Sequence, residues 1–401
     1  MQQLSRTEQG LAERIDAAAM LARVQGWCAI NTGTRNLDGL AKQAALLADA
    51  FGALPGDVRL VDPAPVEAVT PAGERVALDH GAHLVLSVRP DARRRFLLTG
   101  HMDTVFPADH PFQALTWSDA DTLNGPGVAD MKGGIAVILA ALAAFENSPA
   151  AGTVGYDVMI NADEETGSLS SAPLIASLAQ GKVAALTYEP SALPDGTLAG
   201  ARPGSGNWSA IVSGRSAHAG RNPQDGRNAV LAAADLALRL KALEHAGLSV
   251  NPARIDGGSA NNVVPDQAVL RFNARPRLPD DAERLATDIA RLVADVKAAH
   301  GVSIHLHGGI TRPPKPMTPD AERLFELVRA CGAALGQPIR WQASGGVCDG
   351  NNIAALGVPV VDTMGVRGGA IHSPDEFLIV PSLAERAALS ALVLHRLAGG
   401  D

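Results

Sequence analysis

The sequence predicts an α/β protein, in which a domain with a mixed, mostly parallel sheet flanked by helices carries an inserted β-α-β-β-α-β domain. With 401 residues, the chain exceeds the length that one hydrophobic core usually serves. Apolar strand-like runs alternate with helical segments over residues 95–189, as in proteins with parallel sheets. The pattern changes after the glycine-rich turn at residues 200–206. We therefore expect the main domain in residues 1–201 and 313–401, and the inserted domain in residues 202–312.

The first part of the main domain is expected to begin with helices and to continue with strands and helices in alternation. The helical pattern at its start is interrupted at Gly33, Asn36 and Gly39. A long apolar segment that begins just after Asp130 favours a helix. The expected helical regions are residues 10–52 and 132–146, and the expected strands lie at residues 76–88, 95–99, 154–160 and 183–188.

The inserted domain is expected to be ferredoxin-like, because its segments follow the order β-α-β-β-α-β. The expected strands are residues 208–213, 249–255, 267–274 and 302–307, and the expected helices are residues 226–245 and 280–299. The proline-rich stretch at residues 313–316 would return the chain to the main domain, which ends with helices near residues 320–335 and 383–397.

Charge and composition argue against several classes of protein. The formal net charge is −8 and there is no extended Lys/Arg run, so we expect no nucleic-acid partner and no anionic membrane surface. Apolar stretches such as residues 135–145 are too short to span a bilayer. The first 20 residues lack the apolar core of a secretory signal, which predicts a cytoplasmic protein. Cys28, Cys331 and Cys348 form no C-x-x-C pair, and we interpret them as buried free thiols.

Acidic residues and a histidine follow the predicted strands at the edge where parallel sheets bind ligands. His101 follows the strand at residues 95–99, Glu164 and Glu165 follow the strand at residues 154–160, and Glu189 follows the strand at residues 183–188. Asp130 precedes the long helix. A histidine near the end of the sequence, His372, completes a set of five candidate metal ligands: His101, Asp130, Glu165, Glu189 and His372.

Two imidazoles and three carboxylates suit zinc, with manganese or cobalt as substitutes. Two divalent ions bring a charge of +4, three carboxylates bring −3, and one bridging hydroxide would make the site neutral. An aspartate shared between the ions would hold them at the spacing of two-metal hydrolases. Glu164 is then left to move a proton between water and a leaving amine. Asp103 is expected to accept the second ring N–H of His101.

Each residue could also have a purely structural role, and the sequence lacks the motifs of other catalytic classes. The pair Glu164 and Glu165 could be a solvated turn, and His372 alone could be a surface or core histidine. A serine hydrolase would need a G-x-S-x-G elbow, which the sequence lacks. Gly125-Pro126-Gly127 lacks the third glycine and the context of a nucleotide-binding motif. Several acids and histidines at successive strand ends favour the metal site.

The chain resembles the di-zinc metallopeptidase family that contains glutamate carboxypeptidase of the G type, acetylornithine deacetylase and succinyl-diaminopimelate desuccinylase. The resemblance covers nearly the whole chain from about residue 23, and the G type is most similar. Its motifs are GHMDTV at residues 100–105, GVADMKGG at residues 127–134, ADEETGS at residues 162–168, YEP at residues 188–190, SAHAG at residues 216–220, and His372.

The resemblance implies a ligand set for each of two zinc ions. His101, Asp130 and Glu189 would hold one ion, and Asp130, Glu165 and His372 would hold the other, so that Asp130 bridges. It also implies a cis peptide bond after Asp130.

The resemblance further implies that the inserted domain is a lid that also forms a homodimer. His218 would stabilise the oxyanion of the tetrahedral intermediate, in relatives often from the neighbouring subunit. Asn262 and Arg275 match positions that contact substrate. Arg312 is a plausible clamp for a substrate carboxylate, because a guanidinium binds that group bidentately.

The sequence thus predicts a zinc-dependent hydrolase of an amide bond next to a free carboxylate. Its substrate would be a small peptide or an N-acyl amino acid, and the foremost expectation is a carboxypeptidase that releases a C-terminal amino acid of the glutamate type. One alternative is an N-acyl-amino-acid deacylase, such as a deacetylase or desuccinylase. An alternative of another class is a catalytically silent metal-binding dimerisation module. The presence of Glu164 argues against that module, which would not need a proton shuttle.

Overall fold

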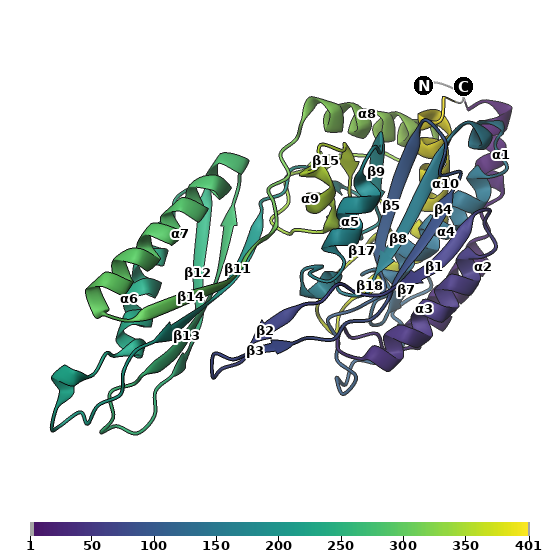
Figure 1. Cartoon of the computed structure of the whole chain (residues 1–401). Coiled ribbons are helices and arrows are strands. Elements are labelled where there is room, and N and C mark those ends of the chain that lie inside the picture. The colour runs from purple at the N-terminus through teal and green to yellow at the C-terminus, as the bar shows by residue number, and fades with distance from the viewer. Residues whose placement is uncertain (1–3, 400–401) are drawn as a thin grey trace.

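A computed structural model describes residues 4–399 as two bodies joined side by side (Figure 1). The larger body holds a six-stranded sheet in the order β1-β4-β8-β5-β9-β16. Strands β8, β5, β9 and β16 run parallel to one another, whereas β4 is antiparallel to both β1 and β8. The predicted mixed, mostly parallel sheet is therefore confirmed. The strands are β1 (Asp57–Val61), β4 (His83–Val88), β5 (Arg95–His101), β8 (Gly155–Asn161), β9 (Ala184–Thr187) and β16 (Val360–Val361).

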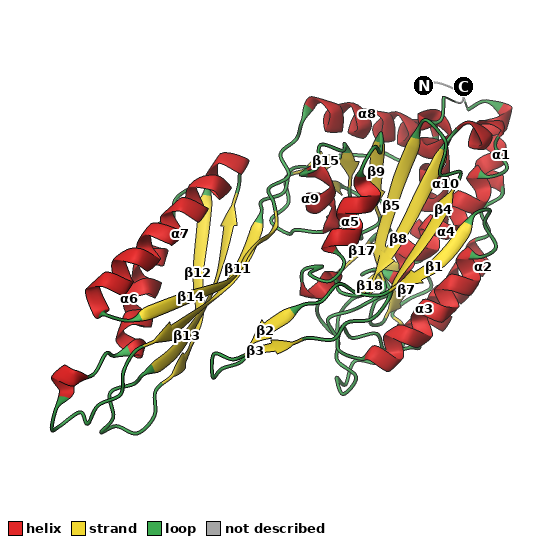
Figure 2. Cartoon of the chain, in the orientation of Figure 1, coloured by secondary structure: helices red, strands yellow, loops and turns green. Residues whose placement is uncertain are grey.

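Helices cover both faces of this sheet (Figure 2). One face packs against the long apolar helices α4 and α10 together with α2 and α3, in a core that includes Leu98, Ile138 and Leu392. The other face packs against α5 and α9 through residues such as Leu97 and Ile353. Every residue of β8 is buried, as expected of a central strand covered on both faces. The helices are α1 (Arg6–Glu13), α2 (Ala17–Cys28), α3 (Leu37–Phe51), α4 (Lys132–Phe145), α5 (Ala172–Ala179), α8 (Pro319–Ala334), α9 (Asp349–Ala354) and α10 (Ser382–Leu397), with short 3-10 turns η1 (Pro149–Thr153) and η2 (Glu164–Thr166).

The smaller body is an antiparallel sheet in the order β12-β13-β11-β14, with helices α6 and α7 on one face. Its chain order β11-α6-β12-β13-α7-β14 is the expected β-α-β-β-α-β order. A separate core fills the space between sheet and helices, with Leu236, Leu270 and Ile289 among its buried residues. The elements are β11 (Ser205–Ser213), η3 (Pro223–Asp225), α6 (Ala229–Lys241), β12 (Leu248–Gly257), β13 (Gln267–Pro276), α7 (Pro279–His300) and β14 (Ser303–Arg312). We call this body the inserted domain.

Two chain segments connect the bodies, and they lie beside each other. The main-chain N–H of Arg202 donates to the carbonyl of Lys315 at 2.9 Å, and the N–H of Lys315 donates to the carbonyl of Arg202 at 3.0 Å. The side-chain amide of Asn351, from α9, donates to the carbonyls of both Pro203 and Pro313. The connections therefore form one short, tied hinge. The exact boundaries at residues 202 and 312 stay predictions.

A third link between the bodies was not predicted from the sequence. The hairpin β2–β3, formed by β2 (Glu67–Val69) and β3 (Arg75–Ala77), extends from the main body to the inserted domain (Figure 1). The Arg271 guanidinium donates to the carbonyl of Val69 at 2.8 Å, and His307 Nε2 lies 3.2 Å from the carbonyl of Glu67. The amide of Gln267 also donates to the carbonyl of Ala72.

Smaller sheets and loops complete the main body. The remaining strands are β6 (Thr116–Trp117), β7 (Thr122–Asn124), β10 (Leu198–Ala199), β15 (Trp341–Gln342), β17 (Gly368–Gly369) and β18 (Phe377–Ile379). The strand expected over residues 76–88 is two strands, β3 and β4, separated by residues 78–82. All three cysteines are free and buried, as predicted. Within residues 4–399, no helix has the length and apolar character needed to cross a bilayer.

Candidate metal centre

The parallel strands β5, β8 and β9 bring three of the predicted segments to one edge of the sheet. His101 is the last residue of β5 and pairs with Asn161, the last residue of β8. Glu164 and Glu165 follow in the short turn η2, and Glu189 comes two residues after β9. These side chains are thus close in space because their strands are parallel neighbours that end together.

Asp130 reaches the same place from the loop before α4. The carboxylate of Glu376 accepts hydrogen bonds from the main-chain N–H groups of Gly127, Ala129 and Asp130, at 3.1, 3.0 and 3.0 Å. Glu376 is buried, and burial raises the pKa of its carboxyl to about 7. This residue therefore fixes the loop that presents Asp130. The peptide bond between Asp130 and Met131 is cis, as the family resemblance implied.

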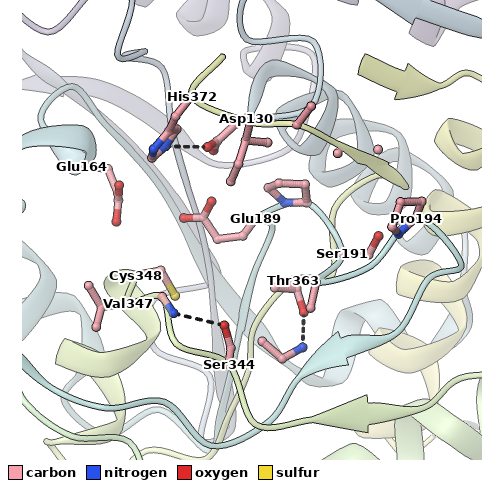
Figure 3. A pocket seen from close by; sticks show the side chains of 18 of the residues that line it. Asp130, Glu164, Glu189, Ser191, Pro194, Ser344, Val347, Cys348, Thr363 and His372 are labelled. Atoms are coloured by element: carbon pink, nitrogen blue, oxygen red, sulfur yellow. Dashed lines mark hydrogen bonds and ion pairs between the residues drawn. The ribbon is translucent and has the colours of Figure 1, made fainter. Parts of the chain in front are cut away.

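The five predicted ligands form two groups that meet at Asp130. Figure 3 shows the contact of Asp130 with His372, in one of these groups. Oδ1 of Asp130 lies 3.1 Å from Nε2 of His101, which is 3.6 Å from Oε2 of Glu189. Oδ2 of Asp130 lies 3.2 Å from Nε2 of His372, which is also 3.2 Å from Oε2 of Glu165. Each oxygen of Asp130 thus belongs to a different group.

These spacings fit donors arranged around metal ions. Ligand atoms about 2.0–2.1 Å from one tetrahedral zinc ion lie about 3.3 Å from each other. The observed separations of 3.1 to 3.6 Å scatter around that value. Imidazole nitrogens and carboxylate oxygens are also the donor types that zinc, manganese and cobalt accept. The residues present therefore fit a centre with two divalent ions and a shared aspartate.

His101 is held by Asp103 through its other ring nitrogen. Nδ1 of His101 lies 3.0 Å from the main-chain oxygen of Asp103 and 3.4 Å from its carboxylate Oδ1. The nearer acceptor is therefore the main-chain oxygen, whereas the sequence suggested the carboxylate. That carboxylate accepts the main-chain N–H groups of Glu164 and Glu165 at 3.1 and 3.2 Å. Asp103 thus orients two strand ends at once.

Glu164 is paired with Arg312. Its Oε1 accepts from Nη2 of Arg312 at 2.6 Å. The other guanidinium nitrogen, Nη1, donates to Asp349 Oδ1 at 2.5 Å and to Asn352 Oδ1 at 2.8 Å. The Arg312 side chain is 2% exposed, so the structure places it behind Glu164 and not in the open part of the site. Its role as a substrate clamp stays a prediction.

Burial and neighbouring charges shift the protonation of these groups. Burial raises the pKa of Glu164 well above its usual range, although the charge of Arg312 acts in the opposite direction. Burial raises the pKa of Glu165 to about 8, and hydrogen bonds to Asp130 and Glu165 raise the pKa of His372 to about 11. Protons and metal ions compete for the same donor atoms, so metal binding releases protons.

The backbone is strained around the second histidine. Thr363, Ala370 and His372 have positive φ values of 62°, 52° and 64°, a region that residues other than glycine rarely adopt. All three line the cavity beside the candidate metal centre. Such conformations cluster at functional sites, where the surrounding structure holds them in place.

The predicted residues of the inserted domain lie apart from this centre. His218 and Asn262 are exposed and close to each other, because Ala219 N–H donates to the carbonyl of Asn262 at 2.9 Å. Their loops extend from the end of the inserted domain that is remote from the main sheet (Figure 1). Arg275 lies nearer the hinge, where its Nη1 donates to the carbonyl of Gly345 at 3.1 Å. In one subunit, therefore, the structure brings together the metal and base candidates, but not His218 or Asn262.

The sequence analysis assigned no role to two acids that organise the site, Glu376 and Asp349. Glu376 comes four residues after His372, and Asp349 follows the glycine pair at residues 345–346. In the sequence, only Glu376 lies near a predicted site residue, His372. Their partners are main-chain N–H groups and a distant arginine, which no spacing pattern reveals.

Comparison with known proteins agrees with this geometry. The sequence model of peptidase family M20/M25/M40 matches residues 97–396 of this chain. Carboxypeptidase G2 from Pseudomonas sp. (strain RS-16) is 28% identical over 332 residues, which cover 80% of this chain and 78% of the relative. Succinyl-diaminopimelate desuccinylase from Xanthomonas oryzae pv. oryzae is 30% identical over 323 residues, which cover 75% of this chain and 83% of the relative.

Solved structures support the fold. A tripeptidase from Staphylococcus aureus superposes with a TM-score of 0.73 at 23% identity, covering 96% of this chain and all of the tripeptidase. Human carnosine dipeptidase 1 superposes with a TM-score of 0.67 at 16% identity, covering 98% of this chain and all of that protein. At these identities the likeness establishes the fold alone.

Proposed function

The chain belongs to peptidase family M20/M25/M40 and is a metallohydrolase, and on that premise we propose that it hydrolyses an amide bond beside a free carboxylate. The foremost form of this proposal is a carboxypeptidase that releases a C-terminal amino acid of the glutamate type, which the similarity to carboxypeptidase G2 supports. The observation that carries the proposal is the arrangement at Asp130. Its two oxygens face separate donor groups, while Glu164 lies beside them and is paired with Arg312.

We propose that two zinc ions occupy the centre, with manganese or cobalt as possible substitutes. His101, Asp130 and Glu189 would hold one ion, and Asp130, Glu165 and His372 would hold the other. When bound, such ions polarise a carbonyl oxygen and lower the pKa of water.

Glu164 is proposed to act as the general base and then as the general acid. A carboxylate oxygen of Glu164 lies within 4.8 Å of donor atoms of His101 and Glu189, close enough to reach a water molecule between them. Because its pKa is raised, the Glu164 carboxylate is a stronger base toward water, and once protonated it can return the proton to the leaving amine. Arg312 fixes the direction of the carboxylate.

We further propose that the protein is a homodimer through the inserted domain. Leu231 and Leu238 on α6 are 59% and 74% exposed and lie seven residues apart, on one face of the helix. A partner subunit covering this face would remove two large apolar side chains from water. It could also supply His218, which is remote from the centre of its own subunit, to stabilise the oxyanion. Asn262 would contact substrate beside it.

The substitution Glu164→Ala tests the catalytic proposal. We expect kcat to fall about 10²- to 10⁴-fold while the metal content measured by mass spectrometry stays unchanged. The matched control is Glu326→Ala, which removes an exposed glutamate from an ion pair on α8 and should leave kcat unaltered. Unchanged turnover in the Glu164 variant would contradict the mechanism.

A hydrolysis screen distinguishes the proposed substrates. The zinc-loaded protein should cleave members of a panel of dipeptides and N-acyl amino acids, and a chelator should abolish the cleavage. The similarity to the desuccinylase favours N-acyl-amino-acid deacylation as the second candidate function, which acyl substrates in the panel would reveal. No chelator-sensitive cleavage across the panel would favour the silent module. The cytoplasmic location stays a prediction.

The dimer has its own test. Leu238→Arg should shift the molar mass measured by light scattering from dimer to monomer, whereas Leu356→Arg, at another exposed leucine, should not. A wild-type protein that is monomeric at micromolar concentration would contradict this part of the proposal.

A further inference from the structure

Two loops that carry metal-ligand candidates lie side by side. The connection between the paired strands β17 and β18, residues 370–376, carries His372 and is called here the His372 loop. The connection between β7 and α4, residues 125–131, carries Asp130 and is called here the Asp130 loop. Because the first residue of β18 pairs with the last residue of β7, the two loops leave neighbouring strands at the same end.

Glu376, the last residue of the His372 loop, joins the two loops. Its Oε2 accepts the main-chain N–H of Gly127 at 3.1 Å, and its Oε1 accepts those of Ala129 and Asp130, both at 3.0 Å. Its main-chain carbonyl accepts the N–H of Gly125 at 3.2 Å. One residue thus binds the Asp130 loop through both its side chain and its main chain.

Further hydrogen bonds close the His372 loop on itself and attach it near the strands. Ser373 Oγ donates to the carbonyl of Ala370 at 2.7 Å, and the N–H of Glu376 donates to the carbonyl of Ser373 at 3.1 Å. The side-chain amide of Asn124 donates to the carbonyls of Glu376 and Pro374, at 2.7 and 3.1 Å. The loop is therefore a closed unit, and Glu376 attaches that unit to the Asp130 loop.

The two histidines of the candidate centre are held in different ways, and we call their donor groups the His101 site and the His372 site. The His101 side chain is 1% exposed and ends a strand of the main sheet, whereas the His372 side chain is 53% exposed. Packing therefore does little to place His372, whose position depends on the backbone of its loop. In the His101 site only Asp130 lies in a loop that Glu376 holds, but in the His372 site both Asp130 and His372 do.

We propose that Glu376 is a positioning residue of the candidate metal centre, and that it sets the spacing between Asp130 and His372. The inference rests on the proposed two-metal centre and gives Glu376 no contact with an ion or with substrate. An ion in the His372 site should depend on Glu376 more strongly than an ion in the His101 site. Partners that orient metal ligands typically change metal affinity about 10- to 100-fold.

The substitution Glu376→Gln tests the proposal while it keeps the size of the side chain. An amide NH₂ group donates hydrogen bonds and cannot accept them, whereas each carboxylate oxygen accepts from the Asp130 loop. In either orientation of the amide, therefore, at least one main-chain N–H group loses its acceptor. We expect the Asp130 loop to shift relative to the His372 loop.

Single-site backgrounds distinguish the two ions. His101→Ala leaves the ligands of the His372 site, His372→Ala leaves those of the His101 site, and competition with a chelator measures the zinc Kd of each full-length protein. Adding Glu376→Gln should raise this Kd about 10- to 100-fold in the His101→Ala background but only about threefold in the His372→Ala background. An equal or larger change in the His372→Ala background, or no change in either, would overturn the inference.

Asp157→Asn is the matched control for the loss of a buried carboxylate. The Asp157 side chain is 1% exposed and pairs with Arg95 at 2.7 Å and with Lys182 at 2.9 Å. It lies near the start of β8, whereas the metal-ligand candidates follow the ends of the strands. This variant should unfold at a lower temperature with the zinc Kd of both sites unchanged. A rise in Kd as large as that from Glu376→Gln would show general loosening and would contradict a positioning role.

A second variant, Asn124→Ala, keeps the inference testable if Glu376→Gln does not fold. It removes the two side-chain hydrogen bonds to the His372 loop and leaves the Glu376 carboxylate in place. We expect the zinc Kd of the His372 site to rise about threefold to tenfold, with a smaller change in the His101 site. An unchanged His372 site would contradict the inference.

These measurements use no substrate, so they separate the inference from the proposed hydrolysis. Zinc binding that depends on Glu376 in a protein that cleaves no amide would support the inference and contradict the hydrolase. A chelator-sensitive hydrolase whose zinc affinity is unaffected by Glu376→Gln would do the reverse. A wild-type protein that binds no zinc would overturn both.

Discussion

The surroundings of the candidate centre and the surface of the inserted domain use the same types of charged residue in opposite ways. Around the candidate centre, Arg312 pairs with Glu164 and Asp349 at 2%, 12% and 6% side-chain exposure. In the inserted domain, Asp235 pairs with Arg239 and His300, all at 27% to 40% exposure. Burial raises the pKa of Glu164, whereas hydrogen bonds from Arg239 and His300 lower the pKa of Asp235.

The difference shows where electrostatic free energy is concentrated. Buried charges depend on each partner, because water cannot replace a partner that is removed. Exposed pairs exchange with water and contribute little to stability. Substitutions of buried and of exposed charged residues should therefore differ by several kcal/mol even when the lost hydrogen bonds have similar lengths.

The largest effect is expected from Arg312→Met. This change leaves the carboxylates of Glu164 and Asp349 buried without their cation, which should lower the free energy of unfolding by about 3–5 kcal/mol. Urea unfolding followed by circular dichroism measures it. The matched change Arg323→Met removes an exposed arginine and should shift stability by less than about 0.5 kcal/mol. Similar losses in both variants would break the comparison.

Two glycines, one near the candidate centre and one in the inserted domain, allow the two regions to be compared by how tightly they are packed. A Cβ at Gly134 in α4 would lie 2.0 Å from the carbonyl oxygen of Tyr188, next to Glu189. Gly134→Ala should therefore cost about 1–3 kcal/mol and lower activity by displacing Glu189.

In the inserted domain, a Cβ at Gly309 would meet no atom within 4 Å. Gly309→Ala should raise stability by about 0.4–1 kcal/mol, since it restricts only the unfolded chain. Thermal unfolding and a single-substrate assay on both variants check the contrast. A destabilised Gly309 variant would show that the inserted domain is packed as tightly as the site.

The smallest effect is expected from Asp235→Asn. The folded-state pKa of Asp235 is lowered, so its contribution is complete above the unfolded carboxyl pKa of about 4 and is lost as pH falls through the folded value. At pH 7 the variant should lose about 0.2–1 kcal/mol, and the difference from the wild type should shrink below pH 4. Chemical unfolding at pH 7, 5 and 3.5 measures this trend. A difference that grows at low pH would contradict the assignment.

Much of the fold could be predicted, because apolar periodicity determines local structure. The strand ending at Asn161 is buried throughout, the strand ending at His101 is buried after Arg95, and β13 of the inserted domain has clear alternation. The hairpin β2–β3 could not be predicted as a link, since its partners, Arg271 and His307, are about 200 residues away along the chain. Short strands such as β16 have only two residues and leave no periodic pattern.

The candidate site was predictable where side chains follow parallel strands. His101, Glu165 and Glu189 fall at strand ends, so a sheet alone brings them together. The surroundings were not predictable from spacing. Glu376 acts through main-chain N–H groups, and Arg312 is turned toward Glu164 by Asp349, contacts that depend on how loops pack in three dimensions.

The hairpin also changes how the two bodies can move. A domain attached only at a short hinge can rotate about it, whereas a second attachment away from the hinge opposes that rotation. The hydrogen bonds between Arg202 and Lys315 lie at the hinge. The contacts of Arg271 and His307 with β2 form the second attachment, away from the hinge. Any swing of the inserted domain must therefore either bend the hairpin at its base or first release those hydrogen bonds. The hairpin therefore restricts rotation of the inserted domain about the hinge.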